Sequence, residues 1–105
     1  MSNYRIDIPQ MSHAFKALSN PNRLKIFMRL LSCCPPGTAC EIEVAQKFCV
    51  GDLGDELDIA PSTLSHHIKE LSQAGLVRLE RRGKNVDCSV VPEQVEALRQ
   101  FFTTE

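Results

Sequence analysis

Cysteine is the residue type in this sequence with the greatest capacity for chemistry. Five cysteines are many for 105 residues, and four of them fall within one short stretch of the chain: Cys33, Cys34, Cys40 and Cys49. Thiolates are preferred ligands of soft, thiophilic ions. The flexible Pro35-Pro36-Gly37 turn allows three of these four side chains to converge on one ion. The stretch therefore predicts a thiolate site for a metal or metalloid.

The spacing of the cysteines argues against two other uses. Cys34-x5-Cys40-x8-Cys49 is not a zinc-finger pattern. The odd number of cysteines, with no apolar secretory segment at the N-terminus, favours thiols in a reducing compartment over a disulfide framework. Cys88 alternates with Val86 and Val90, so it is expected to be a small core residue.

The distribution of charge indicates a polyanionic partner for only one part of the chain. The formal net charge is −1, which by itself predicts no such partner. Residues 41–58 are acidic, however, whereas residues 61–85 are basic and carry small hydroxyl residues and two histidines. A helix can enter the major groove of DNA, and a basic hairpin tip can contact the flanking phosphates. The candidate DNA-binding residues are Ser62, Thr63, Ser65, His66, His67, Lys69, Arg81, Arg82 and Lys84.

A simpler interpretation of the same residues remains open. Ser62 and Thr63 have the residue types that cap a helix N-terminus. A basic stretch can also be a solvated surface with no partner. Capping and DNA contact are compatible, because the exposed N–H groups of a helix N-terminus attract anions.

Helical periodicity predicts the elements that position these residues. The first helix runs from Ile8 to about Ser19, and Asn20-Pro21 caps and starts a second helix, which Pro35-Pro36 ends. We expect the second helix to bury Leu24, Phe27, Met28 and Leu31. Residues 41–48 fit either a short strand or a helical turn, and a short helix is expected over residues 51–57.

The second half of the chain is predicted to contain two helices separated by a hairpin. Pro61 opens a helix whose buried face is Leu64, Ile68 and Leu71, and Gly75 ends it. Residues 77–90 alternate between apolar and polar types around Arg82-Gly83-Lys84-Asn85, which indicates a two-stranded hairpin. Pro92 opens the last helix, with the apolar positions Val95, Leu98, Phe101 and Phe102. The fold class is mainly α with a small β-hairpin, in the order α-α-α-α-β-β-α.

Chain length and hydropathy predict the number of domains and the cellular location. A chain of 105 residues with 43% hydrophobic residues is expected to form a single domain over residues 1–105. No apolar run approaches the roughly 20 residues that span a bilayer. We therefore expect a cytoplasmic protein with no membrane partner.

Several segments together resemble the ArsR/SmtB family of repressors. Leu18-Ser19-Asn20-Pro21-Asn22-Arg23-Leu24-Lys25-Ile26-Phe27 is similar to the opening motif of that family. Residues 50–57 followed by residues 60–68 look like its helix-turn-helix, and residues 71–77 with Arg82-Gly83-Lys84 look like the end of its recognition helix and its wing. The resemblance covers about residues 8 to 102. It implies a homodimeric winged helix-turn-helix repressor that leaves double-stranded operator DNA when an inducer binds, with the dimer interface on the first and last helices.

The resemblance also bears on the inducer. Cys49-Val50-Gly51-Asp52-Leu53 resembles a family site that reads Cys-Val-Cys-Asp-Leu, but Gly51 replaces the second cysteine. The site that the family places on its last helix is absent, because residues 92–105 contain neither His nor Cys. We therefore expect As(III) or Sb(III) as inducer, bound by three thiolates from Cys33, Cys34, Cys40 and Cys49, and no organic cofactor.

Three alternatives remain open. A repressor of the same fold could sense thiol oxidation or persulfide through the same cysteines. A DNA-binding module without any ligand would leave the cysteines idle. A thiol enzyme would need an activated cysteine beside a base, and His66 and His67 lie instead in the expected recognition helix, so we expect no enzymatic activity.

Overall fold

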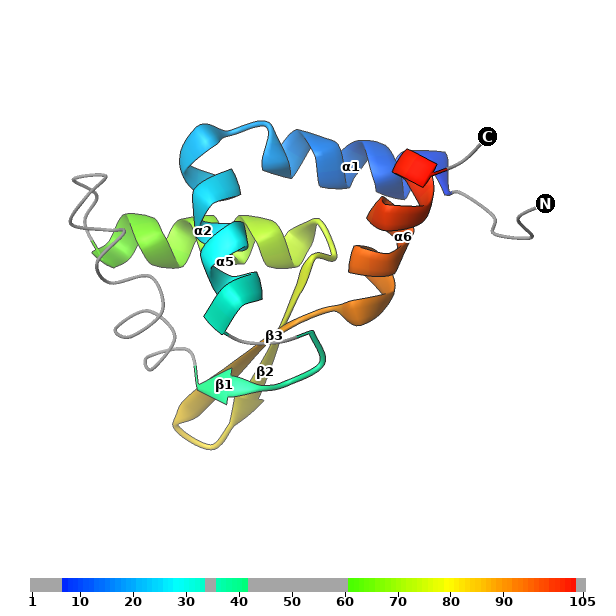
Figure 1. The fold of residues 1–105 in the computed structure, drawn as a ribbon. Helices are drawn as coiled ribbons and strands as arrows, with labels where there is room; N and C mark the ends of the chain where they lie inside the picture. The colour runs from blue at the N-terminus through cyan, green and yellow to red at the C-terminus, as the bar shows by residue number, and fades with distance from the viewer. Residues whose placement is uncertain (1–6, 34–35, 42–60, 104–105) are drawn as a thin grey trace.

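Four helices and a three-stranded sheet make up the part of the chain that the computed structural model describes, residues 7–33, 36–41 and 61–103 (Figure 1). The helices are α1 (Ile8–Leu18), α2 (Pro21–Cys33), α5 (Pro61–Gln73) and α6 (Pro92–Thr103). The strands are β1 (Cys40–Glu41), β2 (Val77–Arg82) and β3 (Asn85–Val90). This arrangement confirms the predicted mainly α fold with a small hairpin. The short helix predicted over residues 51–57 lies outside the described residues.

Capping residues set the helix boundaries close to where the sequence places them. The Asp7 carboxylate accepts a hydrogen bond from the backbone N–H of Gln10 at 3.1 Å and caps α1. The Asn20 side chain accepts from the N–H of Arg23 at 3.0 Å and caps α2. Because both caps hold an otherwise unpaired N–H group, α1 and α2 start at Ile8 and Pro21.

A glycine with positive φ ends α5 and leads the chain into the hairpin. Gly75 adopts a φ of +79°, a conformation that glycine reaches without steric cost. The N–H of Leu76 bonds to the carbonyl of Leu71, and the N–H of Gly75 bonds to that of Ser72, both at 3.0 Å. These two bonds form a Schellman motif, so the predicted helix end at Gly75 is confirmed.

The sheet has one more strand than the sequence predicts. The strands lie in the order β1-β3-β2, and both pairings are antiparallel. Strands β2 and β3 form the expected hairpin around Gly83, and the two-residue strand β1 adds to the other edge of β3 (Figure 1). The segment from residue 41 to 48, which fitted a strand or a helical turn, therefore begins with a strand residue, Glu41.

The core is formed where α2, α5 and the base of the hairpin meet. Its largest fully buried side chains are Ile26, Leu30, Ile68, Leu71, Leu76, Val77 and Val90. Leu64 is buried as well, so the whole apolar face predicted for α5 lies in the core. Cys88 is 2% exposed, which confirms that it is a core residue.

The buried face of α2 differs from the prediction. Phe27 is buried and Leu31 packs partly against the core, but Leu24 and Met28 are exposed. Ile26 and Leu30 occupy the core in their place. The run from residue 26 to 31 is apolar on more than one face at helical spacing, so periodicity alone allows two stripes. Packing against α5 decides between them.

α1 and α6 lie together at one end of the molecule and share an aromatic cluster (Figure 1). The ring of Phe15 lies edge-on to that of Phe101, with centroids 5.2 Å apart, and to that of Phe102 at 5.9 Å. Phe102 nevertheless remains 71% exposed. Val95 and Leu98, which precede Phe102 at helical spacing on the same side of α6, are partly buried and pack against the core.

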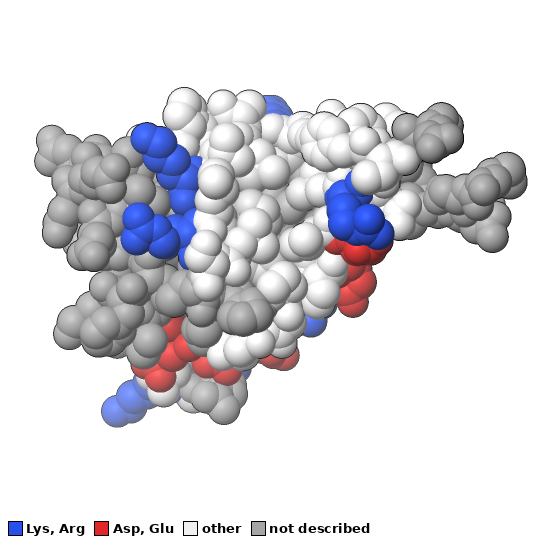
Figure 2. Space-filling model, in the orientation of Figure 1, with Lys and Arg blue, Asp and Glu red and all other residues white. Residues whose placement is uncertain are grey.

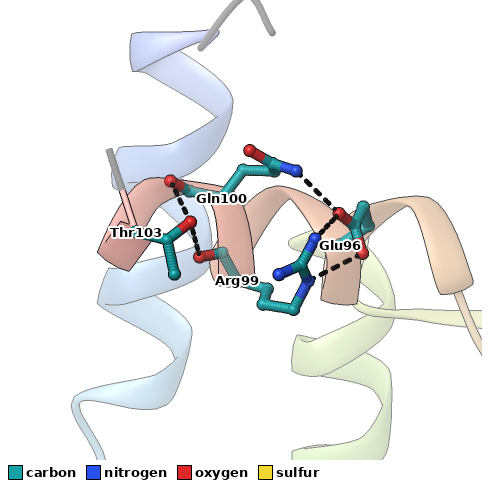
Figure 3. A network of polar contacts seen from close by, with 4 residues as sticks. All are labelled: Glu96, Arg99, Gln100 and Thr103. Atoms are coloured by element: carbon teal, nitrogen blue, oxygen red, sulfur yellow. Dashed lines mark hydrogen bonds and ion pairs between the residues drawn. The ribbon is translucent and has the colours of Figure 1, made fainter. Parts of the chain in front are cut away.

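Another side of α6 carries polar side chains that form hydrogen bonds with one another (Figure 3). Glu96 accepts hydrogen bonds from the guanidinium of Arg99 and the amide of Gln100. These bonds, chiefly the one from Arg99, lower the pKa of Glu96 to about 2. The polar groups on this side of α6 are therefore paired, whereas Phe101 and Phe102 remain in part open to solvent although they contact Phe15.

Candidate DNA-binding surface and cysteine positions

The first two turns of α5 have one polar face turned outward. Ser62, Ser65, His66 and Lys69 are exposed, and they follow each other at helical spacing. Thr63 is half-buried. His66 Nε2 lies 3.9 Å from the carboxylate of Glu70 one turn later. This face presents hydroxyl, imidazole and ammonium groups together, which suits hydrogen bonding to base edges and phosphates.

His67 points the other way, into the protein. It is 8% exposed, and its Nδ1 lies 3.4 Å from Nη1 of Arg23 on α2. Burial, and then the charge of Arg23, lower the pKa of His67 below its ordinary value of 6.5. Among the DNA contacts expected from the sequence, His67 is thus the one whose placement is at odds with direct contact, because it lies on the core side of the helix.

Arg23 links three helices and was not singled out by the sequence as a site residue. Its Nε donates to the carbonyl of Ala17 in α1 at 2.8 Å, while its Nη1 approaches His67 on α5. Its own backbone N–H donates a hydrogen bond to Oδ1 of Asn20. Arg23 therefore fixes the orientation of α5 relative to α1 and α2. The Asn-Pro-x-Arg spacing is the signal that could have indicated this role.

The hairpin carries basic residues at its tip and acidic residues on its outer face. Arg81 and Lys84 are exposed near the Gly83 turn, and Arg82 is the last residue of β2. Asp87 is the Cα partner of Glu80 on one side and of Glu41 on the other, so carboxylates form a row across the sheet. Figure 2 shows acidic side chains over the sheet and basic ones beyond them at the lower edge. Arg78 is exposed two positions before Glu80 and belongs to the same face, so charges of both signs mix there and the tip is the more basic part of the hairpin.

The cysteines predicted as ligands are only partly placed. Cys33 is the last residue of α2 and Cys40 is the first residue of β1. Cys34 and Cys49 lie outside the described residues. Within residues 7–33, 36–41 and 61–103, no three His, Cys, Asp or Glu residues gather as a metal site. The same ranges contain no helix that is long and apolar enough to cross a membrane.

Comparison with known proteins identifies the fold. The pattern of a family described as "Helix-turn-helix domain" matches residues 18–80. The chain is 34% identical over 80 residues to the cadmium resistance transcriptional regulatory protein CadC of Listeria innocua, which covers 76% of this chain and 57% of that protein. It is 30% identical over 86 residues to the transcriptional repressor SmtB homolog of Synechocystis, which covers 82% of this chain and 55% of the relative. The chain belongs to the ArsR/SmtB family of winged-helix regulators.

A solved structure agrees with this assignment at the level of the fold. A homodimeric winged helix-turn-helix DNA-binding domain from Mycobacterium bovis superposes with a TM-score of 0.58 at 20% identity, covering 98% of this chain and 87% of that one. In a winged helix-turn-helix fold, α5 occupies the position of the second helix of the motif and β2–β3 that of the wing. The chain spans little more than half the length of the two curated relatives.

Proposed function

We propose that this ArsR/SmtB protein is a repressor that binds operator DNA as a homodimer and releases it when a thiophilic inducer binds cysteine thiolates. The observation that carries the DNA-binding part is the outward polar face of α5 beside a wing with a basic tip. Ser62, Ser65, His66 and Lys69 would contact the major groove, with Thr63 at its edge. Arg81, Arg82 and Lys84 would contact the flanking phosphates. His67 would act indirectly, by holding α5 through Arg23.

The homodimer is supported by the exposed aromatic surface of α6. Phe102 is 71% exposed although it stacks edge-on against Phe15 and Phe101. A second copy of this chain would cover that surface. The Mycobacterium bovis domain with the same fold is itself described as homodimeric. Two copies of α5 would then enter successive major grooves, about 34–36 Å apart.

We propose trivalent arsenic or antimony as the inducer, held by three thiolates drawn from Cys33, Cys34, Cys40 and Cys49. Soft cations and metalloids prefer thiolate ligands, and the relative from Listeria is named for resistance to cadmium, another thiophilic ion. Gly51 removes one thiolate from the site that begins at Cys49. Cys40 begins the strand that leads into this segment, so ligation there would connect the loop, the segment and the wing.

A release titration tests this function. The reduced protein, bound to operator DNA, is titrated in parallel with arsenite, antimonite, Zn(II), Cd(II) and a persulfide donor, and fluorescence anisotropy follows the bound DNA. We expect release by As(III) and Sb(III). Release by the persulfide donor alone would contradict the metalloid assignment and favour a thiol-redox sensor.

Cysteine variants then locate the site. Cys40→Ser and Cys49→Ser should each retain operator binding and lose release by As(III), because each removes a thiolate from a three-thiolate site. Cys33 and Cys34 are adjacent and can replace one another, so only their double change should abolish the response. Full induction of the Cys40→Ser/Cys49→Ser variant by arsenite would refute the assignment.

A further inference from the structure

The register of the sheet places two cysteines directly opposite each other. Cys40 on β1 and Cys88 on β3 are Cα partners in the antiparallel ladder. These residues are 48 positions apart in the sequence, and no spacing motif connects them. On its other side, Cys88 is the Cα partner of Leu79 on β2. Cys88 therefore has one cysteine and one leucine as its cross-strand neighbours.

The alternation of the sheet places this cysteine pair on the side of the core. Successive positions along a strand belong to opposite faces. The neighbouring row, Glu41, Asp87 and Glu80, contains the carboxylates and lies on the outer face. Cys88 is 2% exposed and belongs to the hydrophobic core. The row that contains Cys40 and Cys88 is therefore the inner one.

The distance between directly opposed residues suits a bridging atom. Cα atoms of such pairs lie about 4.5–5.5 Å apart in antiparallel sheets. Even the short S–S link of a disulfide joins cysteines whose Cα atoms are about 4.4–6.8 Å apart. The backbone register therefore places the two cysteine positions at a separation that one bridging group can span.

The short edge strand provides access to the buried thiol. β1 contains only two residues and lies at the edge of the sheet, whereas β2 and β3 pair along six positions each. The residues before β1 are held by a bond of 3.0 Å from the N–H of Gly37 to the carbonyl of Val90. Among the described residues, β1 pairs with β3 at two positions and β2 pairs with β3 at six, so opening the β1 edge disrupts less of the ladder than opening the hairpin would.

We propose that Cys40 and Cys88 form a cross-strand dithiol that captures trivalent arsenicals. Two S–H groups react with two As–OH groups, so that two As–S bonds and two water molecules form and the oxidation state of arsenic does not change. This inference rests on the proposed function, because it adds Cys88 to the thiolates that the inducer meets. Capture fixes β1 to the middle strand of the sheet and so connects the inducer to the wing.

The test isolates the pair in the full-length chain. The Cys33→Ser/Cys34→Ser/Cys49→Ser variant retains only Cys40 and Cys88. Its matched control carries the additional change Cys88→Ala, so that a single thiol remains. Circular dichroism checks that both variants are folded. If the Cys88→Ala control is not folded, a control that carries Cys88→Val in its place is used. The probe is phenylarsine oxide, which reacts with two thiols and releases one water.

The two-thiol variant should bind one equivalent of phenylarsine oxide, lose both reactive thiols and retain the arsenical against excess monothiol. Its affinity should exceed that of the one-thiol control by about 100-fold or more, because the second bond forms within the same molecule. Equal affinities in the two variants would overturn the dithiol.

Operator release by arsenite is measured separately on the wild-type protein. Capture by the dithiol without release would overturn the proposed function and support the dithiol. Release by wild-type protein together with failed capture by the two-thiol variant would overturn the dithiol alone.

Discussion

At the scale of single residues, α5 separates two adjacent histidines into different roles. His66 is exposed beside Glu70, whereas His67 is buried against Arg23. From the sequence, both are expected to contact DNA because they lie near the start of the expected recognition helix, an expectation that does not weigh how close each lies to the apolar side of that helix. The apolar positions Leu64, Ile68 and Leu71 define the core side of α5, and His67, three residues after Leu64 and four before Leu71, lies at the edge of that side.

The burial of His67 predicts a pH dependence of stability. Its pKa is lowered in the folded protein, so the unfolded chain binds a proton more readily below pH 6.5. Stability is therefore present in full above pH 6.5 and is lost as the pH falls from 6.5 toward the lower pKa of the folded state. Urea unfolding at a series of pH values should show this decline in the wild type and a smaller one in His67→Gln. His66→Gln is the matched control and should keep the wild-type slope, whereas an unchanged slope in His67→Gln would contradict the assignment.

The proposed DNA contacts predict two distinguishable binding defects. Ser65→Ala and His66→Ala should weaken operator binding more than binding to unrelated DNA, by about 1–3 kcal/mol each. Lys84→Ala should weaken both equally and reduce the slope of log K against log salt by about one. Binding isotherms at several salt concentrations measure both effects. A Lys84→Ala protein with the wild-type salt slope would remove Lys84 from the phosphate contacts.

At the scale of elements, local signals in the sequence determine where helices begin and end more reliably than they determine which side faces inward. Asn20, Pro21 and Gly75 act through backbone geometry and their nearest neighbours, so the sequence predicts their effects correctly. The buried face of α2 depends on α5, which lies some 40 residues later in the chain, and Leu24 and Met28 were wrongly placed for that reason. The pairing of Cys40 with Cys88 likewise depends on the register between two strands that are distant in sequence.

The junction between α5 and the wing predicts a stability difference between two glycines. Gly75 has φ +79° and Gly83 has φ +60°, so alanine at either position should cost about 1–2 kcal/mol. A Cβ at Gly75 would also lie 3.2 Å from Nε2 of Gln10, whereas one at Gly83 meets no atom within 4 Å. Chemical denaturation should therefore show a larger loss for Gly75→Ala than for Gly83→Ala. The reverse order would contradict the packing of α5 against α1 at this corner.

At the scale of the whole molecule, the surface is divided into parts that would serve different partners. The polar face of α5 and the basic tip of the wing suit DNA. The aromatic residues of α6 lie at the other end of the molecule, beside α1 (Figure 1). Such a division allows a dimer to form without covering the DNA-binding surface.

This division predicts the effect of a charge at the aromatic end. Phe102→Glu places a carboxylate beside the rings of Phe15 and Phe101, and it should weaken the dimer by about 2 kcal/mol or more, which is an increase in the dimer Kd of roughly 30-fold. Met28→Glu is the matched control, because Met28 is 59% exposed but lies on α2. Sedimentation velocity over a dilution series should show dissociation of the Phe102→Glu protein at concentrations where the wild type and Met28→Glu remain dimeric. Operator binding should weaken in parallel, since each monomer reaches only one half-site. A Phe102→Glu protein that stays dimeric would place the interface elsewhere, and a wild-type monomer at all concentrations would refute the proposed dimer.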